Sequence, residues 1–254
     1  METDIKKRIL SLQSEAPVVS IVIPAYNEEK YLLPTIEALS KIKTHYPTEI
    51  ILVDNGSTDN TKFLAESCGL KVIEEKQKGT SYARQAGLMA AKGEYIFTTD
   101  ADSIVPATWV EESMHYFQNN KNLCFLSGGS QYGGVHWSFH WMKYVIDTIR
   151  KWSGREPKCP AIYGYNSVFK KDIAIQMGGY SPGINLGEDL LLAAKIGEKG
   201  DMLSIQDMST TVITSGRRFS SFGKVLKYIM FHWVFERSFS DAHKLGARDF
   251  ADIR

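Results

Sequence analysis

The stretch that decides the fold is Glu94-Tyr95-Ile96-Phe97-Thr98-Thr99-Asp100-Ala101-Asp102, a short apolar run that ends in two aspartates. Residues i and i+2 of an extended chain share a face, so Asp100 and Asp102 should point in roughly the same direction. Two such carboxylates repel each other unless a positive charge lies between them. Mg²⁺ or Mn²⁺ supplies that charge and keeps coordination positions for substrate phosphates. Paired aspartates are also common in ordinary turns, so the pair alone leaves both interpretations open.

Three further apolar segments precede this one, and each is followed by a helical pattern. The strand-like segments are residues 18–24, 49–54 and 71–75. The helical periodicity covers residues 28–42, 58–67 and 81–91. Four strands that alternate with these helices predict an α/β fold, in which a doubly wound, mostly parallel central sheet is flanked by helices on both faces.

Polar segments follow all four strands, at the carboxyl edge where ligands bind in such sheets. They are Ala25-Tyr26-Asn27-Glu28, Asp54-Asn55-Gly56-Ser57, Lys78-Gly79 and Asp100-Ala101-Asp102. Each alone can be a strand end, a tight turn or a helix cap. Together they favour a binding rim, because structure alone does not require acids after strands two and four. The sequence after strand one is neither Gly-x-Gly-x-x-Gly nor a Walker motif, which disfavours a dinucleotide enzyme or a P-loop ATPase.

The bulk properties are those of an ordinary globular chain. It has 254 residues, of which 43% are hydrophobic and 23% charged, and a formal net charge of +1. This charge argues against nucleic-acid binding, which needs a basic surface. Three widely spaced cysteines indicate neither a disulfide framework nor a zinc site and fit a reducing cytoplasm. The sequence shows no secretory signal and no apolar run of membrane-spanning length, so we expect a cytoplasmic, soluble or peripheral protein.

In order and spacing, these motifs resemble those of the family 2 inverting glycosyltransferases of the GT-A fold. The resemblance continues beyond the first half and covers roughly residues 18–200. The segments that carry it are residues 23–29, 53–59, 78–84, 100–102, 164–169, 177–180 and 187–189. One departure is visible, because the second strand ends in Asp54-Asn55 where many relatives have two acids. Asp54 is therefore left alone to serve the base or ribose.

The resemblance implies that a nucleotide-sugar, a UDP-sugar or a GDP-sugar, binds at this rim. The residues that would contact it are Pro24, Ala25, Tyr26, Glu28, Asp54, Lys78, Arg84, Asp100 and Ala101. Asp54 would hydrogen-bond the base or ribose, and Asp100 would lean toward the ribose or sugar. Asp102 would ligate the Mg²⁺ or Mn²⁺ that bridges the two phosphates, and this ion would stabilise the leaving nucleoside diphosphate.

The acceptor side needs a general base on the face opposite the leaving group. Asp189 is the candidate, and Glu188 is the lesser choice and a substrate contact. Both acids begin a predicted helix, where they also interact favourably with the helix dipole. Arg217 and Arg218 follow an apparent strand at residues 210–214, and they either reach a diphosphate or anionic acceptor or form a solvated pair.

The predicted organisation has three parts. Residues 1–17 form an N-terminal extension, and residues 18–215 form the GT-A domain, whose nucleotide half ends near Asp102. Residues 216–254 form a helical tail that is basic and aromatic enough to lie on a membrane surface, where a lipid-linked acceptor would be presented.

The predicted function is metal-assisted, inverting sugar transfer to an acceptor hydroxyl on a glycan or lipid, in the synthesis of cell-envelope glycan, polysaccharide or glycolipid. Two alternatives remain open. One is a binding module that keeps the GT-A fold without catalysis. The other is a nucleotidyltransferase, which should carry a glycine-rich basic loop after strand one in place of Pro24-Ala25-Tyr26-Asn27.

Overall fold

The computed structural model describes residues 2–135, 137–139, 141, 162–184, 187–205 and 207–226. The chain divides into two compact units. The first comprises residues 1–131 and 160–214, and the second comprises residues 132–159 and 215–254. The predicted tail belongs to the second unit, and its residues beyond 226 lie outside the described part of the chain.

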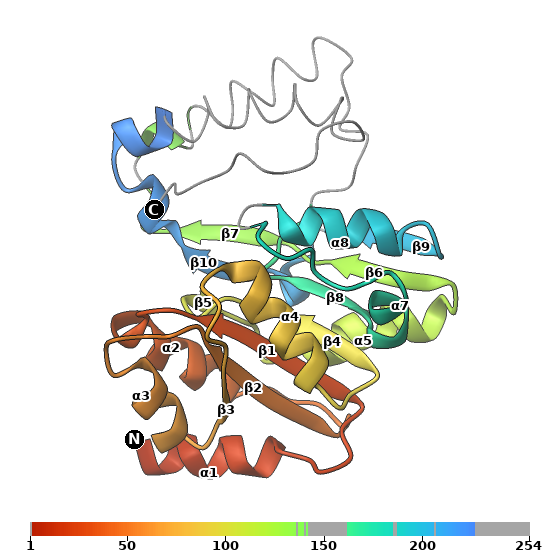
Figure 1. Ribbon diagram of the computed structural model, residues 1–254, viewed down its shortest axis with the longest axis horizontal. Helices are drawn as coiled ribbons and strands as arrows, with labels where there is room; N and C mark the ends of the chain where they lie inside the picture. Colours follow the sequence, from red (N-terminus) through yellow and green to blue (C-terminus); the bar gives the residue numbers. More distant parts are fainter. Residues whose placement is uncertain are drawn as a thin grey trace. The chain divides into compact units, whose positions relative to one another are not determined.

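The first unit is built on a seven-stranded sheet of order β3-β2-β1-β4-β8-β6-β9 (Figure 1). The strands are β1 (Val19–Ala25), β2 (Thr48–Asp54), β3 (Lys71–Glu74), β4 (Tyr95–Thr98), β6 (Leu123–Ser127), β8 (Ser167–Lys170) and β9 (Asp201–Ser204). Strands β1 to β4 are parallel, whereas β8 runs antiparallel to β4 and β6. Ala25 pairs with Asp54 at the ends of β1 and β2, so the two following loops leave the sheet side by side.

Helices cover both faces of this sheet, as the alternating pattern predicts. They are α1 (Glu2–Leu12), α2 (Glu29–Leu39), α3 (Thr61–Ser67), α4 (Thr80–Ala90), α5 (Trp109–Asn119), α7 (Lys171–Gln176) and α8 (Glu188–Ile196). One core joins the sheet to α1, α2, α3 and α5, and the other joins it to α4, α7 and α8. Neighbouring strand residues alternate between the cores: Ile21 and Ile23 lie in the first, and Val22 lies in the second.

The predicted element boundaries differ from the observed ones by a few residues. Helix α2 ends at Leu39, before the predicted 42, and α3 begins at Thr61 where 58 was expected. The delay in α3 has a local cause, because residues 55–60 form a loop that is hydrogen-bonded to the loop after β1. Helix α1 packs into the first core through Ile5 and Ile9, so the N-terminal segment is part of the packed unit.

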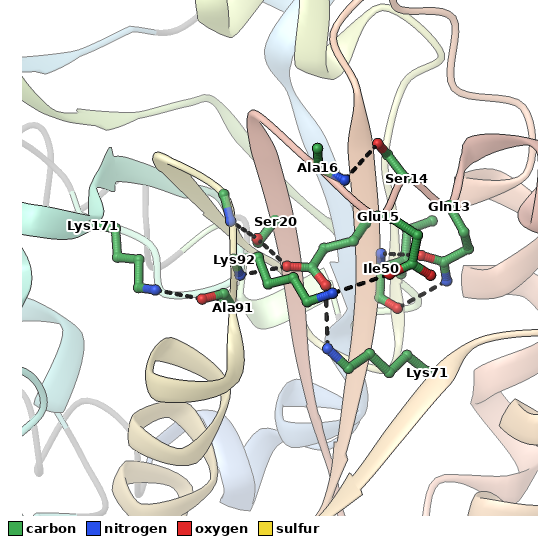
Figure 2. A network of polar contacts seen from close by, with 12 residues as sticks. Gln13, Ser14, Glu15, Ala16, Ser20, Ile50, Lys71, Ala91, Lys92 and Lys171 are labelled. Atoms are coloured by element: carbon green, nitrogen blue, oxygen red, sulfur yellow. Dashed lines mark hydrogen bonds and ion pairs between the residues drawn. The ribbon is translucent and has the colours of Figure 1, made fainter.

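The amino ends of the parallel strands are joined by a network around the buried carboxylate of Glu49, whose partners Ser20, Lys71 and Lys92 are labelled in Figure 2. Its Oε1 accepts hydrogen bonds from Ser20 Oγ (2.7 Å) and from the backbone N–H of Lys92 (2.6 Å). Its Oε2 lies 3.3 Å from Lys71 Nζ. The network therefore links the starts of β1, β2, β3 and β4, at the edge of the sheet opposite the polar loops.

A second, three-stranded sheet contains β5 (Ser103–Ile104), β10 (Val212–Ser215) and β7 (Ser130–Gly133). Strand β10 pairs antiparallel with β5. Two short 3₁₀ turns flank β10, namely η1 (Met208–Thr210) and η2 (Gly216–Phe219).

In the second unit, the rings of Tyr132, Phe139 and Phe219 pack together, with centroids 4.5 to 5.3 Å apart. Among the described residues, no helix combines the length and apolarity needed to cross a bilayer.

Candidate functional site

The loops after β1 and β2 are bound to each other through polar side chains. The backbone N–H of Asn27 donates to Ser57 Oγ (3.0 Å), and that of Thr58 donates to Asn27 Oδ1 (2.8 Å). Asn27 has a φ of 54°, in the left-handed region that asparagine tolerates better than most residues. The backbone N–H of Glu28 donates to Thr61 Oγ1 (2.8 Å) at the start of α3. Two of the four predicted rim segments are thus held in a fixed relation.

Asp54, the last residue of β2, is buried at this rim. Its Oδ2 accepts a long hydrogen bond from the backbone N–H of Ser57 (3.3 Å). Its Oδ1 is buried and has no hydrogen-bond partner among the residues the structure describes. A buried acceptor without a donor is costly, so this oxygen is suited to a donor supplied by a ligand.

Asn55 explains the departure from the two-acid pattern. Its Nδ2 donates to the carbonyls of Glu75 (3.0 Å) and Gln77 (2.7 Å), and its Oδ1 accepts from the N–H of Gly79 (2.8 Å). An amide can donate and accept at once, whereas a carboxylate only accepts. Asn55 therefore fixes the loop that leads to α4, and an acid at this position would lose two of the three bonds.

The remaining residues expected to contact the nucleotide lie at the same carboxyl edge. Pro24 and Ala25 end β1. The exposed Lys78 places its Nζ 5.5 Å from the ring centroid of Tyr26, which is within the range of a cation–π contact. The loops after β1 and β3 are therefore in contact through these two side chains.

The turn after β4 alternates between buried and partly exposed positions. Ala101 is buried and its carbonyl accepts from Thr35 Oγ1 (2.9 Å), whereas Asp100 and Asp102 are partly exposed. Asp102 Oδ1 accepts from Thr214 Oγ1 (3.3 Å), and that hydroxyl accepts from Ser103 Oγ (3.0 Å). This chain of hydroxyl groups orients the Asp102 carboxylate.

No cluster of three or more His, Cys, Asp or Glu side chains in the described part of the chain is placed to hold a metal ion. Magnesium and manganese are commonly bound by one or two carboxylates, with substrate phosphates and water completing the shell. The oriented Asp102 carboxylate fits that kind of site.

Arg84 lies beside three acids, one in the turn after β4 and two at the start of α8. It comes from α4, and its side chain is 5% exposed. Its Nη2 donates to Asp100 Oδ1 (3.0 Å), its Nε lies 3.5 Å from Glu188 Oε1, and its Nη1 lies 4.0 Å from Asp189 Oδ2. Burial by itself would lower the pKa of Arg84, but Glu188, Asp100 and Asp189 raise it above its ordinary value. Arg84 therefore stays charged.

The two acids that begin α8 differ in environment. The Glu188 side chain is 6% exposed, and burial raises its pKa to about 7, with Arg84 opposing the shift and Asp189 adding to it. The Asp189 side chain is 19% exposed, and its Oδ1 accepts from the N–H of Leu190 (3.0 Å). Asp189 is thus the more accessible of the pair.

Gly164 and Tyr180 complete the surroundings of Arg84, although sequence reasoning did not name them as site residues. A Cβ at Gly164 would lie 2.1 Å from Arg84 Nη1 and 2.4 Å from Asp189 Oδ2. Tyr180 is buried beside Arg84, and burial raises the pKa of its hydroxyl. The only signal in the sequence was their presence in the segments 164–169 and 177–180.

The predicted arginine pair lies in η2, in the second unit. The backbone N–H of Arg217 donates to Ser215 Oγ (3.4 Å), and its side chain is half-buried. The side chain of Arg218 is outside the described part of the structure.

Comparison with known proteins identifies the family. Residues 20–178 match the sequence model described as Glycosyl transferase family 2. The chain belongs to glycosyltransferase family 2. The resemblance seen in the motifs is therefore confirmed, and the matched region contains both the donor-side loops and Gly164.

A curated relative in this family is the glycosyltransferase GlyG of Streptococcus pneumoniae serotype 4, which is 39% identical over 100 residues. Those residues make up 37% of this chain and 33% of GlyG, so the match spans one third of that protein.

Two solved glycosyltransferases have a similar fold. The mannosyltransferase PcManGT of Pyrobaculum calidifontis, in complex with GDP-Man and Mn²⁺, superposes with a TM-score of 0.60 at 20% identity, covering 82% of this chain and 61% of that one. TarS residues 1–349 of S. aureus, in complex with UDP-GlcNAc, gives 0.59 at 18% identity, covering 78% and 58%. The predicted GT-A fold, with its mostly parallel sheet flanked by helices, is confirmed.

Proposed function

We propose that this family 2 chain transfers a sugar from a nucleotide-sugar to an acceptor hydroxyl with inversion at the anomeric carbon. The observation that carries the proposal is the cluster around Arg84. It brings the acid that follows β4 and the acids that begin α8 to a single guanidinium. One transfer step needs donor-binding groups and a base this close together.

The donor is a UDP-sugar or a GDP-sugar bound along the loops after β1, β2 and β3. The buried Asp54 Oδ1 supports this, because it would accept a hydrogen bond from the base or from a ribose hydroxyl. Lys78 beside Tyr26 supplies a positive charge for the phosphates. TarS with UDP-GlcNAc and PcManGT with GDP-Man show that related folds bind both donor types.

A divalent ion, Mg²⁺ or Mn²⁺, would be held by Asp102 together with the two donor phosphates. The support is the orientation of the Asp102 carboxylate by Thr214 and the Mn²⁺ in PcManGT. When bound, such an ion stabilises the negative charge that builds on the leaving diphosphate.

Asp189 acts as the general base. Its carboxylate takes the proton of the acceptor hydroxyl while that oxygen bonds to the anomeric carbon and the bond to the diphosphate oxygen breaks. Its exposure supports this choice over Glu188, because the base must reach an incoming substrate whereas Glu188 is nearly covered. Asp100 would orient the ribose or the sugar from the other side of Arg84.

The acceptor is a hydroxyl on a glycan or a lipid, and the second unit would contact the cytoplasmic face of a membrane where such an acceptor is anchored. The support is a set of exposed aromatic side chains in this unit, Trp137, Trp141 and Phe222, with the cationic Lys224 nearby in sequence. Aromatic and cationic side chains together suit a membrane surface.

The first test is calorimetric titration of nucleoside diphosphates and nucleotide-sugars, with and without Mn²⁺. We expect one nucleotide type to bind in a metal-dependent manner, and Asp102→Ala to weaken that binding by about tenfold or more. The control is Asp4→Ala, which removes an exposed acid of α1 and should bind like the wild type. If no nucleotide binds to the wild-type protein, the transferase proposal fails and the binding-module alternative gains.

A further inference from the structure

We infer that Arg84 is a positioning residue that couples the donor-side carboxylate of Asp100 to the acceptor-side carboxylate of Asp189. The inference rests on the proposed function and changes the role expected for Arg84, from a nucleotide contact to a residue that acts through two carboxylates.

The burial of Arg84 is the first argument. Its side chain is 5% exposed, and three carboxylates surround the guanidinium at 3.0, 3.5 and 4.0 Å. A phosphate brought to it would have to displace acids that already balance its charge. Guanidinium is a rigid planar fork whose N–H groups reach separate carboxylates along different edges, whereas the three donors of a lysine ammonium all radiate from one atom. Arg84 is therefore suited to fixing the positions of these carboxylates relative to one another.

The contacts of Arg84 are also unequal. Nη2 donates a hydrogen bond to Asp100. In contrast, Nε and Nη1 are buried and have no hydrogen-bond partner within the described part of the chain. The acids that face them, Glu188 and Asp189, are 3.5 and 4.0 Å away, in the first turn of α8. Buried donors without partners are costly, so an inward shift of this turn is favoured. Catalytic contacts commonly tighten in this way when substrate binds.

Gly164 provides an independent argument. The Cβ of any other residue would lie 2.1 Å from Arg84 Nη1 and 2.4 Å from Asp189 Oδ2, directly against the two atoms that must approach. The φ of Gly164 lies outside the left-handed region, so alanine is compatible with the backbone there. The carbonyl of Gly164 is held by Thr98 Oγ1 (2.7 Å), which limits how far the backbone can retreat. Glycine at this position thus leaves the space that Arg84 Nη1 and Asp189 Oδ2 need to approach each other.

The test compares Arg84→Lys, Gly164→Ala, Asp189→Asn and the double variant Arg84→Lys/Asp189→Asn. The matched control is Gly223→Ala, because a Cβ at Gly223 meets no atom within 4 Å. The substrates are UDP-GlcNAc and GDP-mannose with Mn²⁺ and water as the acceptor, so that free sugar and nucleoside diphosphate are released. Nucleoside diphosphate binding and urea unfolding are measured on every variant.

We expect Arg84→Lys and Gly164→Ala to lower kcat by about 100-fold, the cost of a base misplaced by roughly 1 Å. Gly164→Ala should leave nucleotide affinity within about threefold of the wild type, because it keeps the hydrogen bond between Arg84 and Asp100. Arg84→Lys changes that bond, so its nucleotide affinity should also fall, but by much less than its kcat. The double variant should be no slower than Asp189→Asn alone, since Arg84 acts through Asp189. Gly223→Ala should match the wild type.

Two results would overturn the inference: losses that multiply in the double variant, or losses that appear only in nucleotide affinity. If the wild type does not bind these donors, or binds without hydrolysing them, the kinetic comparison does not apply, and the proposed function is decided separately by the nucleotide titrations described above. The unfolding data then decide the coupling, because Arg84→Lys and Asp189→Asn should shift the urea midpoint by less together than the sum of their separate shifts. Additive shifts would refute it.

Discussion

At the scale of single residues, two opposing effects act on the charge of Glu188. It begins α8, where a negative charge is favoured by the helix dipole, yet its side chain is buried. Burial raises its pKa to about 7, although Arg84 stabilises the charged form. Because the folded-state pKa lies above the ordinary value of 4.5, the proton on Glu188 stabilises the fold at low pH. That contribution is complete below pH 4.5 and is lost as the pH rises through about 7.

Glu188→Gln should therefore flatten the pH dependence of stability. The neutral glutamine keeps the shape of the protonated acid, so wild type and variant should be similar near pH 5. By pH 8.5 the wild type should have lost up to roughly 3 kcal/mol relative to the variant, the equivalent of the pKa shift. Urea unfolding across this pH range measures the difference. Parallel stability profiles for the two proteins would show that Glu188 titrates normally.

The residue scale also shows what the sequence could and could not predict. Asp102 and Asp189 stood out because each follows a recognisable strand or precedes a helix. The structural use of Asn55 could not be seen, because its three partners lie 20 to 24 residues away in the next loop. The burial of Arg84 depends on a helix that begins at Glu188, about a hundred positions later. Local patterns locate polar residues, but only tertiary packing decides which of them face a ligand.

At the scale of elements, the two ends of the parallel strands differ in their roles, one in the candidate site and the other in stability. The carboxyl ends of β1, β2 and β4 lead into the candidate site, whereas the amino ends are joined through Glu49 (Figure 2). The alternation of strands and helices predicted the sheet because each strand is buried and each helix has one apolar face. The antiparallel β8 was not predicted, since its partners β4 and β6 lie far from it in sequence.

Glu49→Ala should destabilise the fold without changing the site. Its removal leaves the buried Ser20 hydroxyl and the N–H of Lys92 without their acceptor, which should lower the free energy of unfolding by about 1–3 kcal/mol. Nucleotide affinity should be unchanged, because the network lies at the opposite edge of the sheet. The control is Glu74→Ala, whose exposed ion pair with Lys62 should contribute nothing measurable. Equal losses of stability in both variants would contradict this account of Glu49.

At the scale of the whole molecule, the chain combines a first unit that carries the candidate site with a second unit formed by two separate segments. The first unit buries its apolar residues in two cores on either face of the sheet. Both units also expose single large apolar side chains, such as Phe63 in the first unit, and those of the second unit include Trp137 at 71% and Phe222 at 59%. Isolated exposed apolar residues are ordinary, so the membrane contact proposed for the second unit depends on a direct test of its exposed aromatic side chains.

The membrane proposal makes the exposed aromatic side chains Trp137, Trp141 and Phe222 responsible for binding lipid. We expect the protein to float with anionic vesicles at low salt, and the triple variant Trp137→Ser/Trp141→Ser/Phe222→Ser to remain mostly in the soluble fraction. The control is Phe63→Ser in the first unit, because Phe63 is 70% exposed and so matches Trp137 in exposure. Raising the salt concentration should weaken binding, since the basic side chains act through screened charge attraction. If wild type and triple variant float equally, the exposed aromatic residues do not bind the membrane. If the wild type does not float at all, the second unit does not bind anionic lipid, and a water-soluble glycan becomes the acceptor to test.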